Sequence, residues 1–98
     1  MSNKYILDKN GNPTPCENLF EWAKWFETAN RQIRDDKIGN VRVSTVFLGL
    51  DHSFGGMTPI LFETMIFGGP HDSYQDRYSN LDDAIKGHQL AVDLVSAQ

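Results

Sequence analysis

Two apolar segments separated by a glycine-containing loop dominate the hydrophobic pattern of this chain. Residues 41–50 (VRVSTVFLGL) and 59–67 (PILFETMIF) each alternate their side chains between two faces, which is the spacing of β-strands. The intervening residues 51–58 (DHSFGGMT) have the composition of a loop. We therefore expect an antiparallel pair of strands, with the rest of the chain covering it.

The two strands are expected to pair with residues of equal parity opposite one another, if the loop is centred near Phe54. Thr45 then lies opposite Glu63. The odd-numbered face, which the helices would cover, holds Val41, Val43, Phe47, Leu61, Met65 and Phe67. The even-numbered face is also apolar, with Val46, Leu48, Ile60, Phe62 and Ile66. Soluble monomers rarely expose so large an apolar patch. Other strands or a second subunit must cover it, and we predict a homodimer.

A helix is predicted from Leu19 to Asp36 or Lys37, ending before Gly39. Asn18 can cap its first turn, and Glu21 lies three residues further on, as in a capping box. One wide apolar arc contains Leu19, Trp22, Ala23, Trp25, Phe26, Ala29 and Ile33. An aromatic stripe at helical spacing is typical of a hydrophobic core rather than of a ligand site.

A second helix is predicted at the end of the chain. Ser79 is its expected cap, and Asp82 and Asp83 favour the positive end of the helix dipole. Its apolar arc contains Leu81, Ala84, Ile85, His88, Ala91, Val92 and Val95. A histidine therefore lies in the middle of the buried face.

Two shorter strands complete the predicted fold. Lys4–Leu7 precedes a turn at Asn10-Gly11, and the two prolines that follow exclude a central strand. Tyr74–Tyr78 is the other short strand. The prediction is a single α+β domain over residues 1–98, in the order β-α-β-β-β-α. It has an antiparallel sheet of three to four strands and two helices packed on one face.

Composition narrows the classes of partner. The net charge is −4 and the nine Lys and Arg residues are scattered, so we expect no nucleic-acid surface. No segment is long and apolar enough for a membrane span, and the first residues lack the apolar core of a secretion signal. Cys16 is the only cysteine, which excludes an internal disulfide. We expect a cytoplasmic protein without a cofactor.

The chain resembles a family of small uncharacterised proteins encoded by bacteriophages and prophages. The segments that carry the resemblance are ILDKNGNPTP, LFEWAKWFE, VRVSTVFLGLDH, LFETMIFGG and RYSNLDDAIKGH. They span nearly the whole chain but bring no known activity or cofactor. The resemblance implies an accessory protein in the cytoplasm of a bacterial host, where many phage products bind host components.

The loop after the first long strand is the candidate binding site. Asp51, His52 and Phe54 lie in it, beside two glycines that allow backbone to approach a ligand. With Phe62 of the even-numbered face, they form the predicted binding set. The alternative is that Asp51 starts a turn and His52 is solvated. The leading hypothesis is non-enzymatic binding of a host protein or a small molecule, with inhibition of a host process as one form of it.

An enzymatic alternative rests on His52, Glu63 and His88. Glu63 would lie on the predicted core face, where a carboxylate needs a partner, and His88 could supply it as an acid or base of a small hydrolase. A satisfied structural pair is the other interpretation. His52, His71 and His88 lack metal-ligand spacing, so we expect no metal site. A structural phage component is a third hypothesis.

Overall fold

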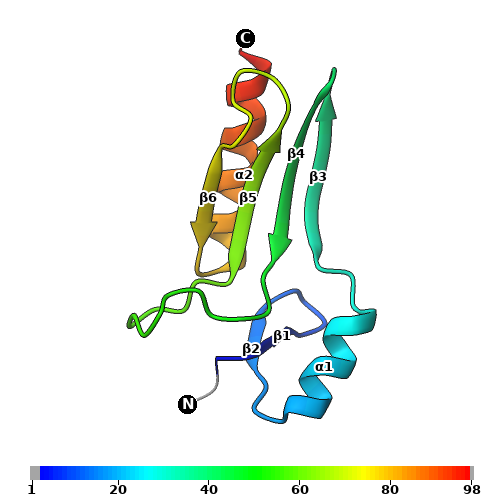
Figure 1. Ribbon diagram of the computed structural model, residues 1–98, viewed down its shortest axis with the longest axis vertical. Coiled ribbons are helices and arrows are strands. Elements are labelled where there is room, and N and C mark those ends of the chain that lie inside the picture. The colour runs from blue at the N-terminus through cyan, green and yellow to red at the C-terminus, as the bar shows by residue number, and fades with distance from the viewer. Residues whose placement is uncertain (1–2, 98) are drawn as a thin grey trace.

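The protein has an α+β fold with one four-stranded antiparallel sheet and a separate two-stranded sheet. The computed structural model describes residues 3–97, and Figure 1 shows its arrangement. The elements are β1 (Tyr5–Leu7), β2 (Pro13–Pro15), α1 (Leu19–Thr28), β3 (Gln32–Ile38), β4 (Val41–Phe47), β5 (Phe62–Phe67), β6 (Gln75–Tyr78) and α2 (Leu81–Ser96). The large sheet has the order β3-β4-β5-β6. The predicted class and element order are confirmed in outline, with β2 and β3 as added strands.

The first helix is shorter than predicted. Asn18 caps it as expected, because its side chain accepts a hydrogen bond from the Glu21 N–H at 3.0 Å. The helix ends at Thr28, so the prediction that it continues to Asp36 or Lys37 is wrong.

The residues beyond it form β3, which pairs with β4 through the two-residue turn Gly39-Asn40. Gly39 has a φ of +59°, the sign required at the first central position of a type II′ hairpin turn. Residues 32–38 form backbone hydrogen bonds with β4 as a strand. This pairing stabilises the strand more than the helical spacing of Ile33 with the apolar arc would stabilise a longer helix.

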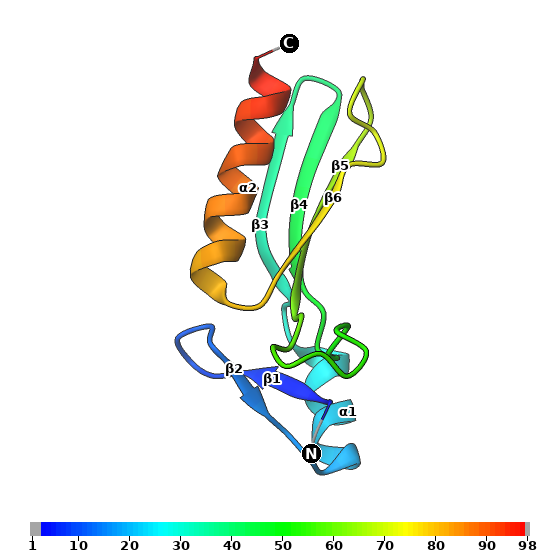
Figure 2. The same ribbon diagram turned by 90° about the vertical axis from the view of Figure 1, so that its left-hand side faces the viewer.

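The two helices occupy different places. Helix α2 lies across one face of the large sheet, whereas α1 lies beyond the end of the sheet beside β1 (Figures 1 and 2). The expectation of two helices on one face therefore holds for α2 alone. The Trp22 indole N–H fixes α1 by donating to the backbone oxygens of Tyr5 and Gly49, each at 3.1 Å. None of the α1 residues is buried, so the aromatic stripe of α1 lies at the edge of the hydrophobic core and not inside it.

The register of β4 and β5 differs by one residue from the prediction. Thr45 pairs with Thr64, and Glu63 pairs with Val46. The connection is not symmetric about Phe54. The Leu48 N–H donates to the backbone oxygen of Leu61. The His52 N–H, four residues further along, donates to the backbone oxygen of Ile60, which is only one residue from Leu61. Since a one-residue shift exchanges the faces of a strand, Glu63 lies on the face away from α2.

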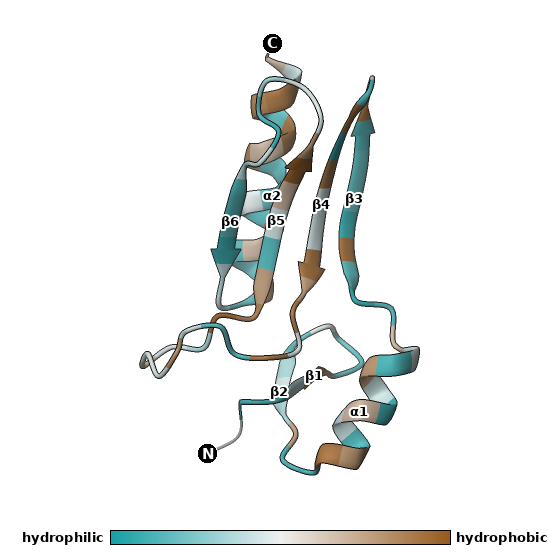
Figure 3. Cartoon of the chain, in the orientation of Figure 1, coloured by the Kyte–Doolittle hydropathy of each residue, from teal (hydrophilic) through white to brown (hydrophobic). Residues whose placement is uncertain are grey.

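The core between α2 and the sheet consists of two apolar clusters. One contains Phe47, Leu61, Phe62, Tyr78 and Ala84, and the other contains Val43, Ile66, Ala91 and Val95. Three buried polar side chains, Thr45, Thr64 and His88, take the positions between the two clusters along β4, β5 and α2. The outer strands β3 and β6 are largely hydrophilic (Figure 3).

The N-cap of helix α2 lies one residue later than predicted. Asn80, rather than Ser79, is the N-cap, and its side chain accepts from the Asp83 N–H at 2.8 Å. The predicted apolar arc is confirmed, since Ala84, His88, Ala91 and Val95 are buried against the sheet. Gly87 is also buried, because the ring of Tyr78 lies directly on its backbone.

We predict that Gly87→Ala destabilises the fold. A methyl group at this position would overlap the Tyr78 ring, which is itself buried and cannot withdraw. Overpacking of this kind costs about 1–3 kcal/mol and exceeds the gain in helix propensity, which is about 1 kcal/mol. Urea unfolding measures the effect, with the exposed Ser96→Ala as a control. A Gly87→Ala variant as stable as the parent would contradict the packing described here.

Candidate functional site

The loop of residues 51–60 is held at its base by one carboxylate. Asp51 accepts hydrogen bonds from the backbone N–H of Ser53 at 2.8 Å, the Ser53 hydroxyl at 3.0 Å and the backbone N–H of Ile60 at 2.9 Å. The His52 N–H donates to the Ile60 backbone oxygen at 3.0 Å. The two ends of the loop are thus tied together.

The hydrogen bonds favour the ionised form of Asp51. Partial burial by itself raises the pKa of this carboxyl, but the donors from Ile60 and Ser53 and the neighbouring His52 hold the pKa below its ordinary value. Asp51 is therefore a carboxylate at neutral pH, and its charge maintains the loop base.

The tip of the loop presents two apolar side chains to solvent. Phe54 is 92% exposed and Met57 is fully exposed. Phe54 also has a φ of +54°, a conformation that is uncommon outside glycine, followed by Gly55 at +90°. The loop projects from the lower end of the sheet (Figure 1). A fixed base and an exposed apolar tip are features of binding loops.

His52 is oriented by the same loop. Its Nδ1 lies 2.9 Å from the Leu50 backbone oxygen. A carbonyl only accepts, so Nδ1 carries the proton and Nε2 is the basic nitrogen. The structure thus brings together Asp51, His52 and Phe54 of the predicted binding set. Phe62, the fourth member, is fully buried in the core and offers no surface to a partner, so its assignment to this set is wrong.

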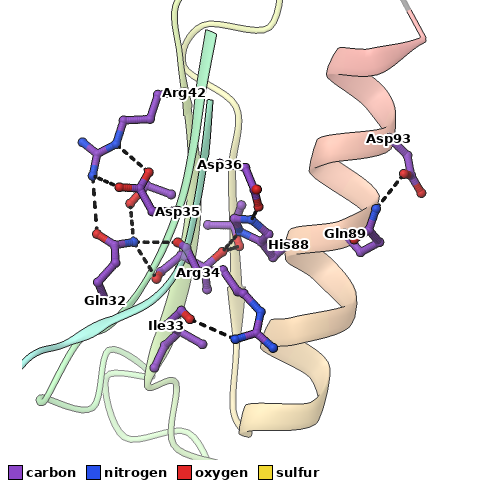
Figure 4. Close-up of polar contacts among 12 residues, drawn as sticks. Gln32, Ile33, Arg34, Asp35, Asp36, Arg42, His88, Gln89 and Asp93 are labelled. Carbon is purple, nitrogen blue, oxygen red and sulfur yellow. Dashed lines mark hydrogen bonds and ion pairs between the residues drawn. The ribbon is translucent and has the colours of Figure 1, made fainter. Parts of the chain in front are cut away.

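A second polar group lies under α2 and was not predicted. The His88 Nδ1 is 2.7 Å from the Thr45 hydroxyl, and the Thr45 hydroxyl is 2.5 Å from the Thr64 hydroxyl. On its other side, the His88 Nε2 is 2.7 Å from the carboxylate of Asp36 (Figure 4). We call these four residues the Thr–His–Asp chain. It connects α2 to β3, β4 and β5.

The donors of the Thr–His–Asp chain can be assigned for a neutral imidazole. The Asp36 carboxylate only accepts, so the His88 Nε2 donates to it. Nδ1 then accepts from the Thr45 hydroxyl, whose oxygen accepts in turn from the Thr64 hydroxyl. Both ring nitrogens of His88 and the hydroxyl of Thr45 therefore have hydrogen-bond partners.

The Thr–His–Asp chain contains the residue types of a hydroxyl-nucleophile triad, but its geometry is structural. Thr45 is fully buried and His88 is 3% exposed beneath α2, so a substrate cannot reach the hydroxyl. The sequence did not predict the other three members of the Thr–His–Asp chain, which are Asp36, Thr45 and Thr64. They lie on three different strands, and only the observed pairing of those strands brings them together near His88. The position of His88 in the apolar arc was the one sequence signal.

Glu63 and His88 do not form the predicted pair. Glu63 lies on the other face of the sheet, where the Arg77 Nε donates to it at 2.8 Å and the Gln75 Nε2 at 2.7 Å. His52 lies in the loop with its own partner. The three residues of the enzymatic hypothesis thus occupy three separate places.

The open face of the sheet carries hydrogen-bonded polar side chains beside the apolar Val46, Met65 and Phe67. Arg42 forms two hydrogen bonds with Asp35, at 2.8 and 3.2 Å, and this pairing holds the pKa of Asp35 below its ordinary value (Figure 4). Gln32 donates to the hydroxyl of Ser44 at 3.0 Å. The apolar face on which the homodimer prediction rested does not form as expected, because the register places Phe62 and Ile66 under α2 and leaves Val46 on the open face opposite Glu63.

Other sites are not found in the described part of the chain. Among residues 3–97, no group of three or more His, Cys, Asp or Glu side chains is arranged to hold a metal ion. No pocket is detected within the same range. None of the helices described is both long and apolar enough to cross a membrane.

Comparisons with known proteins give no match. Neither protein-family models nor curated proteins nor solved structures match this chain.

We predict that Thr45→Val destabilises the protein more than Thr64→Val. Thr45 has two partners, so its loss leaves both the His88 Nδ1 and the Thr64 hydroxyl unpaired, whereas the loss of Thr64 leaves the Thr45–His88 bond in place. A buried unpaired polar group costs about 1–3 kcal/mol. Urea unfolding at neutral pH checks the order. Equal losses, or a larger loss for Thr64→Val, would contradict the central position of Thr45 between Thr64 and His88.

We also predict that the loop base loosens in acid. The depressed pKa of Asp51 means that its stabilising contribution is complete above the pKa of the unfolded chain, about 3.9, and is lost as the pH falls through the lower folded value. The amide NMR signals of Ser53 and Ile60 should titrate in that range. Asp51→Asn should abolish this titration and cost about 1 kcal/mol at neutral pH.

Asp72→Asn, in the β5–β6 connection, is the matched control, because Asp72 accepts from the Gly68 N–H at 2.8 Å and not from the 51–60 loop. Unchanged titration of Ser53 and Ile60 in Asp51→Asn would overturn the role of Asp51.

Proposed function

We propose that this protein is a small, non-enzymatic accessory protein that binds a host protein through the loop of residues 51–60. The single observation that carries the proposal is the exposure of Phe54 and Met57 on a loop whose base is tied by Asp51. A free protein gains no stability from exposing these side chains. Their burial in an apolar pocket of a partner would contribute a large share of a binding free energy.

The fixed base of the loop supports the same proposal. The backbone at both ends is already hydrogen bonded, so the base of the loop has little conformational entropy left to lose when the tip binds. The occupant that fits two neighbouring apolar side chains is a concave apolar pocket on a folded protein. The resemblance to phage and prophage proteins supports a partner in a bacterial cytoplasm, where binding would inhibit or redirect a host process.

The binding experiment begins with a photo-reactive phenylalanine analogue at position 54, which identifies the protein in contact with the tip. The purified pair is then titrated. Phe54→Ser and Met57→Ser should each raise the dissociation constant by about thirtyfold, which is the effect of removing a hot-spot residue. Phe20→Ser is the matched control, because Phe20 is an equally apolar side chain, 83% exposed on α1.

Three results would contradict the proposal: no protein cross-linked at position 54, affinity unchanged in Phe54→Ser, or equal loss in Phe20→Ser. Turnover of a substrate that depends on His52 would favour the hydrolase hypothesis instead. An obligate assembly of many copies would favour a structural phage component.

A further inference from the structure

Helix α2 keeps a partly exposed apolar stripe beside its buried face. Leu90 is 66% exposed and Leu94 is 37% exposed. Residues three and seven positions apart share a side of a helix, so both leucines lie on the same side as Gly87. Gly87 contacts Tyr78 of β6. The stripe therefore runs along the β6 side of α2.

Two exposed residues of opposite charge flank this stripe. Lys86 precedes Leu90 by four residues, and Asp93 follows it by three. In an antiparallel pair of identical helices related by a two-fold axis at Leu90, Lys86 of each copy lies beside Leu94 and Asp93 of the other. The aliphatic stem of the lysine would cover the leucine, and its ammonium group would meet the carboxylate.

We propose that this stripe binds a second copy of the same chain, with α2 antiparallel to α2 and the two-fold axis at Leu90. An isologous interface must be complementary to itself, and the stripe fulfils this condition because the Lys86–Asp93 pairing occurs twice around one apolar centre. The open face of the sheet is a poorer candidate, because its Arg42–Asp35 and Arg77–Glu63 ion pairs are already formed within one chain. The intrachain donor to Asp93 is instead the neutral amide of Gln89, at 2.9 Å (Figure 4).

This inference is independent of the proposed function. The loop of residues 51–60 lies beyond the N-terminal end of α2 (Figures 1 and 2), so pairing of the helices leaves its tip free. The two copies would present their loops at opposite ends of the dimer.

Sedimentation equilibrium of the full chain, up to about 1 mM, tests the proposal, since this is the upper end of weak specific association. Leu90→Ser should weaken dimerisation at least about tenfold. Lys86→Glu and Asp93→Lys should each do the same, because each places two like-charged pairs across the axis. The double variant Lys86→Glu/Asp93→Lys should recover the parent affinity, because it exchanges the signs and restores both pairs.

The controls are the exposed charges Lys24 and Glu27 of α1, where Lys24→Glu and Glu27→Lys should leave dimerisation unchanged. A monomeric parent chain at every concentration would overturn the proposal. So would a dimer that tolerates Leu90→Ser, or a double variant no better than either single one. Circular dichroism of each variant shows whether it remains folded.

A cross-linking measurement tests the axis itself. A residue on a two-fold axis lies beside its own copy, so Leu90→Cys in a Cys16→Ser background should form a disulfide-linked dimer on mild oxidation. Ser96→Cys should not, because six residues from the axis on each helix separate the two copies by roughly 18 Å. Equal cross-linking at both positions, or none at Leu90→Cys at a concentration where this variant sediments as a dimer, would overturn the proposed axis.

Discussion

The arrangement of the core depends on the hydrogen-bonded chain of Thr64, Thr45, His88 and Asp36. It is the polar link between α2 and the sheet, and apolar clusters lie on either side of it. Apolar contacts tolerate small sliding movements, whereas a buried hydroxyl must keep its partner or lose about 1–3 kcal/mol. The chain of hydrogen bonds therefore fixes the position of α2 along the strands and the register of the strands with each other.

The same register determines which face of the sheet carries Glu63. A shift of one residue would place this carboxylate opposite Thr45 under α2, away from Arg77 and Gln75, and an unpaired buried carboxylate is far more costly than a paired hydroxyl. In the observed register, Thr64 takes the buried position and Glu63 takes the open face. Glu63 and Thr64 are neighbours on β5, so they point to opposite faces of the sheet. Their polarity thus selects one of the two registers of β4 and β5 that the apolar side chains alone would allow.

Local signals predicted the parts of the fold that depend on neighbours in sequence. The cap at Asn18, the two long strands and the buried arc of α2 each follow from spacing that is visible within one segment. The grouping of Asp51, His52 and Phe54 in one loop was predicted for the same reason, because the three residues are close in sequence. Strand β3 was missed because Ile33 fits a helical arc, and only pairing with β4 across Gly39 reveals the strand. The Thr–His–Asp chain could not be predicted, since it needs both β3 and the register.

The hydrogen bonds of Trp22 give the molecule an internal optical reporter. The indole N–H donates to the backbone oxygen of Gly49, next to the residue whose oxygen orients His52. The same N–H also donates to the backbone oxygen of Tyr5, and the indole ring stacks on Phe26 at 4.8 Å. Trp25 instead packs edge-on against the buried ring of Phe47 at 5.8 Å. Emission from Trp22 therefore reports on the loop base and emission from Trp25 on the core, and the variants Trp25→Phe and Trp22→Phe, which keep one tryptophan each, would separate the two signals without a label.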